Sequence, residues 1–306
     1  MNRLVALTAS ALALLAAPAA ADELDPSNAD DAFRMNTKMF CSLETEDTTV
    51  YYWEGTVYSV IRGEKDRHLF NVMAMNVRQC EAFEDPVRGV GSRSVSREVM
   101  FYLDPETDEI LRTWENPWTN ETVEVIHVAN DPVNSRRPSW SRDEEGNPHA
   151  RFDPVIVGDY AYEGGGAALL FYDNPLAGDY QDYVGNKYQA AEFLTWTAPL
   201  ADIQDADTPH VVDNVISWGR ISRWIPWMKM GGREGVLVFT TGGLRLNSWD
   251  DMPDRMKDEI RANHPAYVAP PPVDDARPNE TSWTVAKRVI DAERAKDGGK
   301  KASGGH

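Results

Sequence analysis

The sequence predicts a mainly β protein: an antiparallel β-barrel, lipocalin-like or similar, with short flanking helices. Between residues 49 and 241, short runs rich in Val, Ile, Tyr, Phe and Trp alternate with turn residues. Regular spacing of such runs favours a sandwich or barrel over alternating strands and helices. Several runs also mix polar and apolar side chains on one face, which favours a barrel with a partly polar internal cavity, although an exposed sheet face has a similar pattern.

The strand candidates share β-branched and aromatic enrichment and are bounded by turn residues. The strongest are residues 50–62, 68–80, 95–103, 110–115, 122–128, 187–198, 211–224 and 235–241, and weaker ones are 155–157 and 167–172. Gly63-Glu64-Lys65-Asp66 separates the first two candidates, and the turn at 104–108 separates the third and fourth. Both junctions have the composition of hairpin turns, so we expect antiparallel pairing there.

Helices are expected at the two ends of the chain. Residues 29–43, 253–263 and 282–295 have apolar side chains at helical spacing, and Pro253 suits the first turn of the second segment. The run Ala269-Pro270-Pro271-Pro272-Val273 must be extended. The barrel is therefore assigned to residues 22–268, a Pro-rich segment and packing helix to 269–295, and a disordered Gly/Lys/Ser-rich tail to 296–306.

The first 21 residues have the pattern of a secretory signal peptide. Arg3 precedes an apolar run from Leu4 to Ala17, and Ala19-Ala20-Ala21 supplies small residues before Asp22. The apolar run is shorter than the roughly 20 residues that span a bilayer, and no later stretch is long and apolar enough. We expect cleavage after Ala21 and a periplasmic or secreted location.

The net charge argues against nucleic acid and anionic lipid as partners, whereas the cysteine content leaves the state of the two thiols open. The chain has 31 Lys and Arg against 49 Asp and Glu, a net charge of −18, and a field of that sign repels nucleic acid and anionic lipid. Its two cysteines, Cys41 and Cys80, permit either a disulfide, as an oxidising compartment favours, or a pair of buried thiols. Spacing alone does not decide between them.

Motifs for metal, nucleotide and covalent chemistry are missing from the sequence. It has no H-x-H, no H-E-x-x-H and no Cys/His cluster, and no G-x-S-x-G elbow. The glycine clusters at 164–166, 231–232 and 242–243 do not follow a strand and open a helix, so they are interpreted as turns. We expect neither a metal nor a cofactor.

Aromatic and cationic residues are unusually dense in two segments. The first runs from Arg97 to Asp104, continues through Trp114 to Trp118 and ends at His127; the second runs from Trp218 to Met230. A cavity for an apolar or aromatic ligand needs flat aromatic walls with a few fixed donors such as Arg or His. The alternative is that these side chains fill a core, with Arg stacked on the rings.

Five blocks of the sequence resemble the bacterial domain-of-unknown-function family numbered 1838. They are Arg97–Pro105, Trp114–Pro117, Val125–Asn134, Trp224–Met230 and Pro278–Trp283, and they occur in the same order over most of the chain. The resemblance supports family membership. It implies no activity and no catalytic residues.

Three classes of function fit these patterns. The first is a barrel that binds a small hydrophobic or aromatic molecule in an internal cavity. The second is a cofactor-free lyase, isomerase or hydrolase acting on such a compound, with His127 or Glu98 as acid or base and Arg220 or Arg223 stabilising an oxyanion. The third is an envelope interaction protein with a Trp-rich surface. Small β-barrels support binding and catalysis alike, so the fold does not choose between them.

The ligand-binding residues proposed from sequence come from both aromatic segments. They are Arg97, Tyr102, Trp218, Arg220, Arg223 and Trp224. Period-two geometry places Trp218, Arg220 and Trp224 on one strand face, together with Asn214 and Ile216. Since a buried Arg220 needs a compensating group, we expect either a ligand oxygen or an internal acid such as Glu98 beside it.

Overall fold

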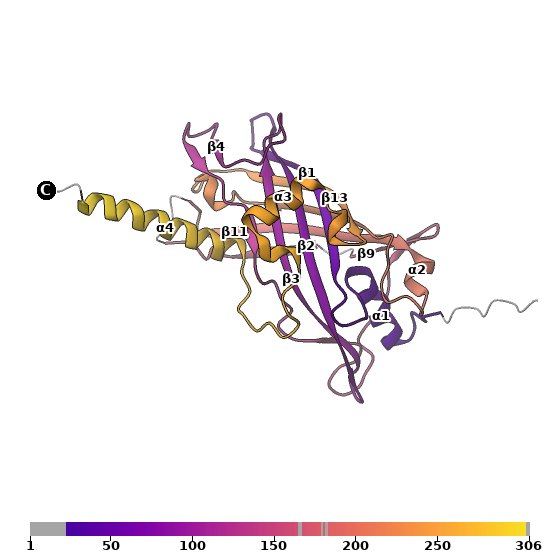
Figure 1. The fold of residues 1–306 in the computed structure, drawn as a ribbon. Helices are drawn as coiled ribbons and strands as arrows, with labels where there is room; N and C mark the ends of the chain where they lie inside the picture. The colour runs from indigo at the N-terminus through magenta and orange to yellow at the C-terminus, as the bar shows by residue number, and fades with distance from the viewer. Residues whose placement is uncertain (1–22, 165–166, 179, 181–182, 304–306) are drawn as a thin grey trace, which may run out of the picture.

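One large antiparallel sheet forms the body of the protein (Figure 1). The computed structural model describes residues 23–164, 167–178, 180 and 183–303, so the predicted signal at 1–21 lies outside the described residues. The long central strands are β1 (Thr49–Val60), β2 (Arg67–Asp85), β3 (Gly89–Leu103), β11 (Lys187–Pro199), β12 (Val215–Ser222) and β13 (Val236–Leu246). They are hydrogen-bonded in the order β3-β2-β1-β13-β12-β11, so the first and last long strands of the chain meet in the middle of the sheet.

Short strands continue the sheet at both edges. Beside β3 lie β6 (Val128–Asn130) and β7 (Ser139–Trp140), and beside β11 lie β10 (Ala167–Asp173) and β9 (Tyr160–Glu163), the latter followed by β8 (Val155–Val157). A separate hairpin pairs β4 (Thr113–Glu115) with β5 (Thr122–Glu124). The helices are α1 (Ala29–Phe40), α2 (Leu200–Gln204), α3 (Asp254–Asn263) and α4 (Ser282–Ser303), with 3-10 turns η1 (Pro226–Met228), η2 (Trp249–Asp251) and η3 (Pro265–Val268).

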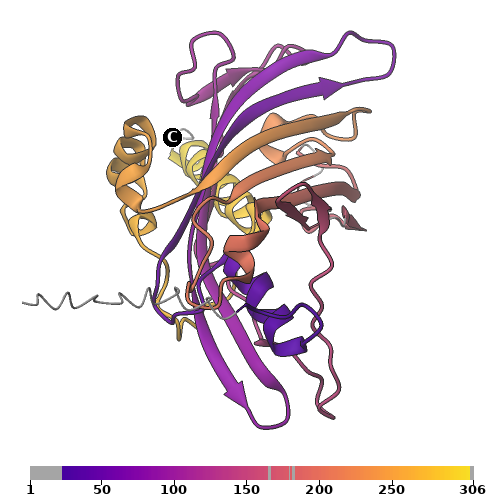
Figure 2. The same cartoon turned by 90° about the vertical axis from the view of Figure 1, so that its right-hand side faces the viewer.

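The sheet is strongly curved but open, which corrects the predicted closed barrel (Figure 2). Within the described ranges, no strand pairing joins the β3 edge to the β9 and β10 edge. Closure requires that the two edge strands meet in register. Here the β3 edge is occupied by the two short strands β6 and β7 instead. The coarser prediction, a mainly β protein with an antiparallel sheet and few helices, is confirmed.

The outer face of the sheet is covered by α3 over strands β1 to β3. Side chains such as Met73, Met75 and Phe101 alternate toward this face and pack against Met256 and Ile260 of the helix. Farther along the same face, β10 and β11 have no such cover, and Leu169 and Phe171 are 77% and 70% exposed. The outer core therefore lies under one half of the sheet.

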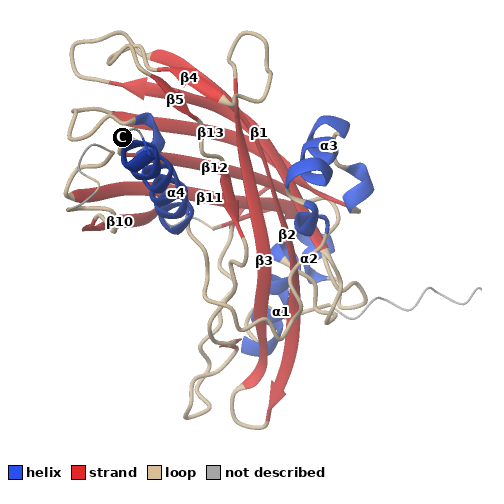
Figure 3. Cartoon of the chain, turned by 60° about the vertical axis from the view of Figure 1, so that its left-hand side comes forward, coloured by secondary structure: helices blue, strands red, loops and turns tan. Residues whose placement is uncertain are grey.

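The inner face carries the larger core and faces α4 (Figure 3). Phe70, Tyr102 and Phe239 belong to this face, and the loop after β12 folds over them with Trp224 and Trp227. Rings from both aromatic segments of the sequence meet here, since the ring centroids of Trp114 and Trp227 are 5.8 Å apart and those of Trp118 and Trp224 are 5.2 Å apart. At one end of the inner face, the aromatic segments therefore fill a packed core.

Glycine permits the close approach of β1 and β13 that the curvature requires. A Cβ atom added at Gly55 would lie 2.0 Å from the carbonyl oxygen of Thr240, well inside van der Waals contact. Glycine at such a position marks a site where backbones approach closely. The two strands whose pairing joins the halves of the sheet thus depend on a residue without a side chain.

A disulfide joins the end of α1 to β2. The helix is capped by the side chain of Asn28, which accepts from the amide of Asp30 at 2.9 Å. Immediately after the helix, Cys41 is bonded to Cys80, and both residues are buried. Of the two alternatives that the sequence left open, the structure has the disulfide.

Most predicted strands and helices are found, but the segment 122–128 divides into β5 and β6, and β7, β9 and α2 were not predicted. The hairpin expected across the turn at 104–108 is reduced to an isolated bridge between Leu103 and Ile110, and β4 pairs with β5 instead. Strands 155–157 and 167–172 are found, the first with the predicted bounds. The strands β2 and β3 extend to Asp85 and back to Gly89, beyond the predicted ends. Helix α4 continues to Ser303 through Gly298 and Gly299, where the poor helix propensity of glycine favoured an earlier end. None of the helices in the described part combines the length and apolar character that a bilayer crossing needs.

We predict that the Cys41–Cys80 bond stabilises the fold chiefly by restricting the unfolded chain. Cys80→Ser should lower the free energy of unfolding by about 3–4 kcal/mol, measured by urea denaturation. Reductant should lower the stability of the wild type to a similar extent and leave that of the variant unchanged. Two titratable thiols in denatured, unreduced wild-type protein would contradict the bond.

Candidate functional site

Two neighbouring pockets with lining residues in common lie on the inner face, between the sheet and the start of α4. We call them the two lobes of the inner-face cavity. One lobe has a volume of about 290 Å³ and is lined by residues that include Tyr102, His127, Phe239 and Trp283. The other has a volume of about 270 Å³ and is lined by residues that include Trp53, Arg78 and Trp218. The residues that line both lobes are Glu98, Met100, Val128, Glu192, Arg220 and Ser282.

Arg220 and Glu192 form a cross-strand ion pair where the lobes meet. They are directly opposite each other on β12 and β11, and Arg220 Nη1 lies 3.2 Å from Glu192 Oε1. Arg220 Nη2 donates to the hydroxyl of Tyr188, and the Arg220 guanidinium lies over the Tyr188 ring. Its Nε is buried and has no hydrogen-bond partner among the described residues.

The opposite wall of the cavity comes from β2, β3 and β6. Glu98 of β3 lies between Asn76 and Asn130 in the sheet register, and Asn130 Nδ2 donates to Glu98 Oε1 at 2.6 Å. The side chain of Asn130 is buried, the residue being 4% exposed, yet its Oδ1 has no partner in the described part of the chain. On β2, Arg78 Nε donates to Asn76 Oδ1 at 2.7 Å.

Burial shifts the ionisation of the charged groups in this cavity. It lowers the pKa of the Arg220 guanidinium, with Tyr102, Tyr172 and Glu98 opposing the shift. Burial likewise lowers the pKa of Arg78, against the influence of Tyr51 and Glu98. The pKa of Glu192 is raised, first by burial and then by the nearby Glu98 carboxylate. Two guanidinium groups and two carboxylates therefore line the second lobe.

The first turn of α4 covers the first lobe of the cavity. Trp283 Nε1 donates to the hydroxyl of Tyr172 at 2.9 Å, and its ring meets that of Tyr188 edge-on with centroids 4.7 Å apart. Farther along the helix, Ala286 and Ile290 pack against the segment around Leu176. The helix is thus fixed to the sheet by its first three turns, and its later turns project beyond the sheet (Figure 1).

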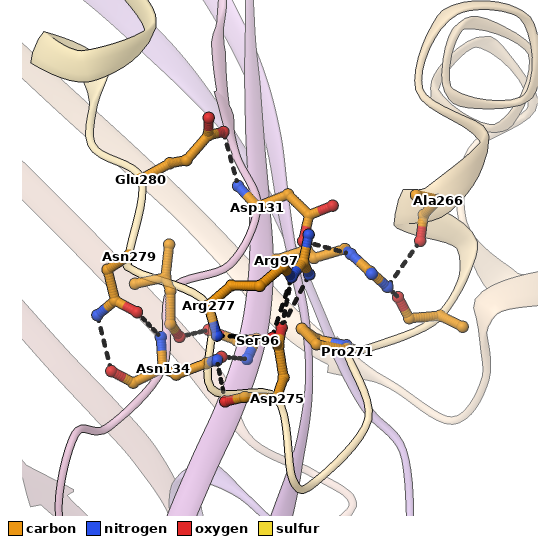
Figure 4. Close-up of polar contacts among 12 residues, drawn as sticks. Ser96, Arg97, Asp131, Asn134, Ala266, Pro271, Asp275, Arg277, Asn279 and Glu280 are labelled. Atoms are coloured by element: carbon orange, nitrogen blue, oxygen red, sulfur yellow. Dashed lines mark hydrogen bonds and ion pairs between the residues drawn. The ribbon is translucent and has the colours of Figure 1, made fainter.

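The segment 266–280 carries the chain from the outer face to the inner face around the β3 edge (Figure 4); we call it the strap. Asp131 receives Arg97 Nε at 2.9 Å and Arg277 Nη2 at 2.7 Å, and Arg277 also pairs with Asp275. Arg97 Nη1 donates to the carbonyl oxygens of Ala266 and Ala269 at 3.0 and 2.7 Å. Charged side chains therefore hold the strap to β3.

A second set of contacts fixes the strap immediately before α4. The Asn134 amide donates to Asn279 Oδ1 at 2.9 Å, and Asn279 Nδ2 donates to the Asn134 carbonyl at 2.8 Å. The Glu280 amide donates to the Pro132 carbonyl at 2.9 Å. These residues belong to two of the sequence blocks singled out above, Val125–Asn134 and Pro278–Trp283, and their contacts position the first turn of α4 over the cavity.

The structure brings together some of the residues proposed from sequence and separates others. Glu98, Tyr102, His127, Trp218 and Arg220 line the cavity. Their proposed roles remain predictions.

Three other proposed ligand contacts, Arg97, Arg223 and Trp224, are not among the residues that line this cavity. Arg97 points to the strap through Asp131. Since β12 ends at Ser222 and Pro226 begins a 3-10 turn, period-two alternation does not reach the next two residues. Trp224 is packed in the aromatic core, 4% exposed, and Arg223 is exposed.

His127 is held by the backbone of its neighbours. Its Nδ1 accepts from the Tyr102 amide at 3.2 Å, and its ring stacks on that of Tyr102. Burial, aided by the Arg112 guanidinium, lowers the pKa of His127 to about 4, while the Leu111 carbonyl and Glu259 oppose the shift. The imidazole is therefore neutral at ordinary pH and already uses one nitrogen in a structural contact.

Sequence reasoning missed Glu192 and Arg78, although a signal for both was present. In 187–198, period two aligns Glu192 with Ala190, Leu194 and Trp196, and all of them pair with inner-face residues of β12. In 68–80, Arg78 shares its face with Phe70, Val72 and Ala74, after the polar Asn76. A charged residue that continues an apolar face indicates an inward charge that needs a partner.

Comparison with known proteins identifies the family to which the chain belongs. The model of the family described as "Protein of unknown function (DUF1838)" matches residues 46–290, and the chain belongs to that family. No curated protein matches it. A crystal structure of a LolA superfamily protein from Nitrosomonas europaea is similar over 75% of this chain and 96% of that chain, with 8% identity and a TM-score of 0.18, a likeness too low to carry an argument.

We predict that neutral His127 makes the fold sensitive to acid. The unfolded chain gains a proton near pH 6.5, whereas the folded chain gains it near pH 4, so stability contributed by this residue is lost as pH falls across that window. Between pH 7 and pH 4, the wild type should lose up to about 3 kcal/mol more unfolding free energy than His127→Gln, which retains an acceptor for the Tyr102 amide. Equal losses in the two proteins, measured by urea denaturation, would refute this.

Proposed function

We propose that the protein binds a small hydrophobic or aromatic molecule in the inner-face cavity. The observation that carries the proposal is the composition of the cavity wall, in which aromatic rings lie beside the Arg220–Glu192 ion pair. The ion pair supplies fixed polar groups that can orient a ligand.

The remainder of the wall suits an apolar ligand. Tyr102, Phe239 and Trp283 present rings to the first lobe, and Trp53 and Trp218 present rings to the second. Ligand sites typically combine predominantly apolar walls with a few fixed polar groups. Some aromatic side chains fill the core instead, since Trp118 and Trp224 pack against each other. The cavity lies beside this part of the aromatic core.

Export of the protein is the second part of the proposal. The signal-like sequence of residues 1–21 supports a periplasmic or secreted location. The disulfide supports the same location, since such bonds persist mainly in oxidising compartments. The ligand would then be met outside the cytoplasm.

Catalysis in the same cavity is the second candidate function, and the carboxylate pair favours it. Glu192 has a raised pKa and lies close enough to Glu98 to be influenced by its charge, an arrangement that acid–base enzymes use to hold one carboxyl group protonated. A binding protein should return its ligand unchanged after incubation, whereas an enzyme should convert it. Mass spectrometry of the recovered compound separates these outcomes.

Filling the cavity should abolish binding of an apolar probe. Leu170 lines the first lobe, whereas its neighbour Leu169 points to the outer face. Leu170→Trp should weaken the binding of uncharged N-phenyl-1-naphthylamine at least tenfold, measured by the rise in probe fluorescence, because the added ring occupies the ligand volume. Leu169→Trp is the matched control and should bind as the wild type does. If the control alone loses binding, the probe is held by the outer face and the proposal fails.

Export predicts a defined mature terminus. When the full chain is expressed in a bacterium that has an outer membrane, the protein recovered from the periplasmic fraction should begin at Asp22. N-terminal sequencing determines this residue. Protein recovered intact from the cytoplasm, beginning at Met1, would overturn the predicted location.

A further inference from the structure

An exposed apolar patch lies on the outer face of the sheet, in the half that α3 does not cover. Leu169 and Phe171 of β10 are 77% and 70% exposed, and Phe193 of β11 and Ile221 of β12 are 47% and 42% exposed. The register makes them neighbours, since Leu169 is paired with Ala191 and Ala191 with Ile221. Contiguous apolar patches on a protein surface mark binding sites for a ligand or a partner. We call these four exposed side chains the outer patch.

Arg223 continues the sheet beside this patch. Its amide donates to the Gln189 carbonyl at 3.1 Å, and Gln189 is paired with Phe171 on β10. Arg223 therefore lies in the same cross-strand row as Phe171. The residue is exposed, and its guanidinium has no ion pair or hydrogen bond within the described part of the chain.

Arg223 lines two hollows of different character. One is an apolar groove of about 600 Å³, whose wall includes three side chains of the outer patch, and there the charges of Arg62 and Glu234 offset each other. The other is a polar pocket of about 250 Å³, whose charged lining residues are the cations Lys187, Arg223 and Arg233. An apolar surface thus adjoins a cationic one at Arg223.

The charges of the polar pocket are only partly balanced. Lys187 pairs with Asp173, and Arg233 Nη2 lies 3.8 Å from Glu64 Oε1. All four side chains are at least a third exposed, and exposed pairs of this kind are weak. Arg223 adds a third cation without a partner. This local excess of positive charge, in a chain whose net charge is −18, favours an anionic group at the pocket.

We propose that this surface binds one molecule of a single-chain anionic amphiphile, with a phosphate or carboxylate head beside Arg223 and an alkyl chain on the outer patch. The guanidinium group matches the geometry of such oxyanions and carries the opposite charge. Removal of the outer patch from water supplies the remaining free energy. The site lies on the face of the sheet opposite the inner-face cavity and does not depend on the proposed function.

Two other occupants fit the surface less well. Two copies of the chain, each with a net charge of −18, repel each other, and a bilayer rich in anionic lipid is repelled in the same way. A single amphiphile brings only the charge of its head, which one unpaired guanidinium can balance.

The test measures the binding of decyl phosphate, 1-decanol and inorganic phosphate by isothermal titration calorimetry at pH 7, below the concentration at which decyl phosphate forms micelles. The wild type should bind decyl phosphate at least tenfold more tightly than either of the other compounds, because it alone engages both the cation and the apolar patch. Equal affinities for decyl phosphate and 1-decanol contradict the proposal.

Exposed residues test the two halves of the site separately. Arg223→Gln should weaken decyl phosphate binding at least fivefold and leave 1-decanol binding unchanged, whereas Phe171→Gln should weaken both at least fivefold. Arg261→Gln removes the charge of an exposed residue of α3 and is the matched control, which should bind as the wild type does. A wild-type affinity in Arg223→Gln, or an equal loss in Arg261→Gln, refutes the proposal.

Further measurements separate this site from the other occupants. Decyl phosphate should bind equally well when N-phenyl-1-naphthylamine saturates the inner-face cavity; competition between them would assign the amphiphile to that cavity and overturn this proposal alone. Sedimentation velocity should show a monomer, and a dimer that Phe171→Gln dissociates would assign the patch to a second copy. Flotation of the wild type, but not of Phe171→Gln, with phosphatidylglycerol vesicles would assign it to a membrane. Either result overturns the proposal.

Discussion

The structure depends on how the chain passes from one face of the sheet to the other. After α3 has covered the outer face, the strap must turn around β3 and deliver α4 to the inner face. Prolines in the strap have no N–H to contribute. Gln79 Nε2 of β2 donates to the Pro271 carbonyl at 2.5 Å, and the Asp275 amide donates to the Pro272 carbonyl. Asp131, held between Arg97 and Arg277, supplies the charged anchor. The edge of β3 itself pairs with the short strands β6 and β7, which leave less of it open to another chain.

The two faces of the sheet differ in the side chains that they bury. The outer face packs Met and aromatic side chains against a helix. The inner face combines a dense aromatic end with a row of Arg, Glu and Asn that no hydrophobic core requires. Charged groups are costly to bury even when paired, and these residues are the part of the inner face on which the proposed binding function rests.

Element positions were predictable from the sequence because they follow local rules. Runs of β-branched and aromatic residues located the strands, and Asn28 and Pro253 began helices close to the expected positions. Closure of the sheet was not predictable, since it depends on edge strands far apart in the chain. Within the candidate site, period two placed Trp218 and Arg220 correctly but could not show that β12 stops before Trp224. Glu192, the partner of Arg220, was missed because the sequence of neither strand alone determines the register between β11 and β12.

The pairing of β1 with β13 affects how the chain folds during its synthesis. The register joins Val50 to Leu246 and Val60 to Val236, so the seam at the centre of the sheet closes after nearly all of the chain has been made. Until then, the meander β1-β2-β3 presents an open strand edge, and such edges associate readily with one another. Contacts this distant in sequence also slow folding. During synthesis, the unpaired edge of β1 is therefore open to association with other chains until β13 has been made.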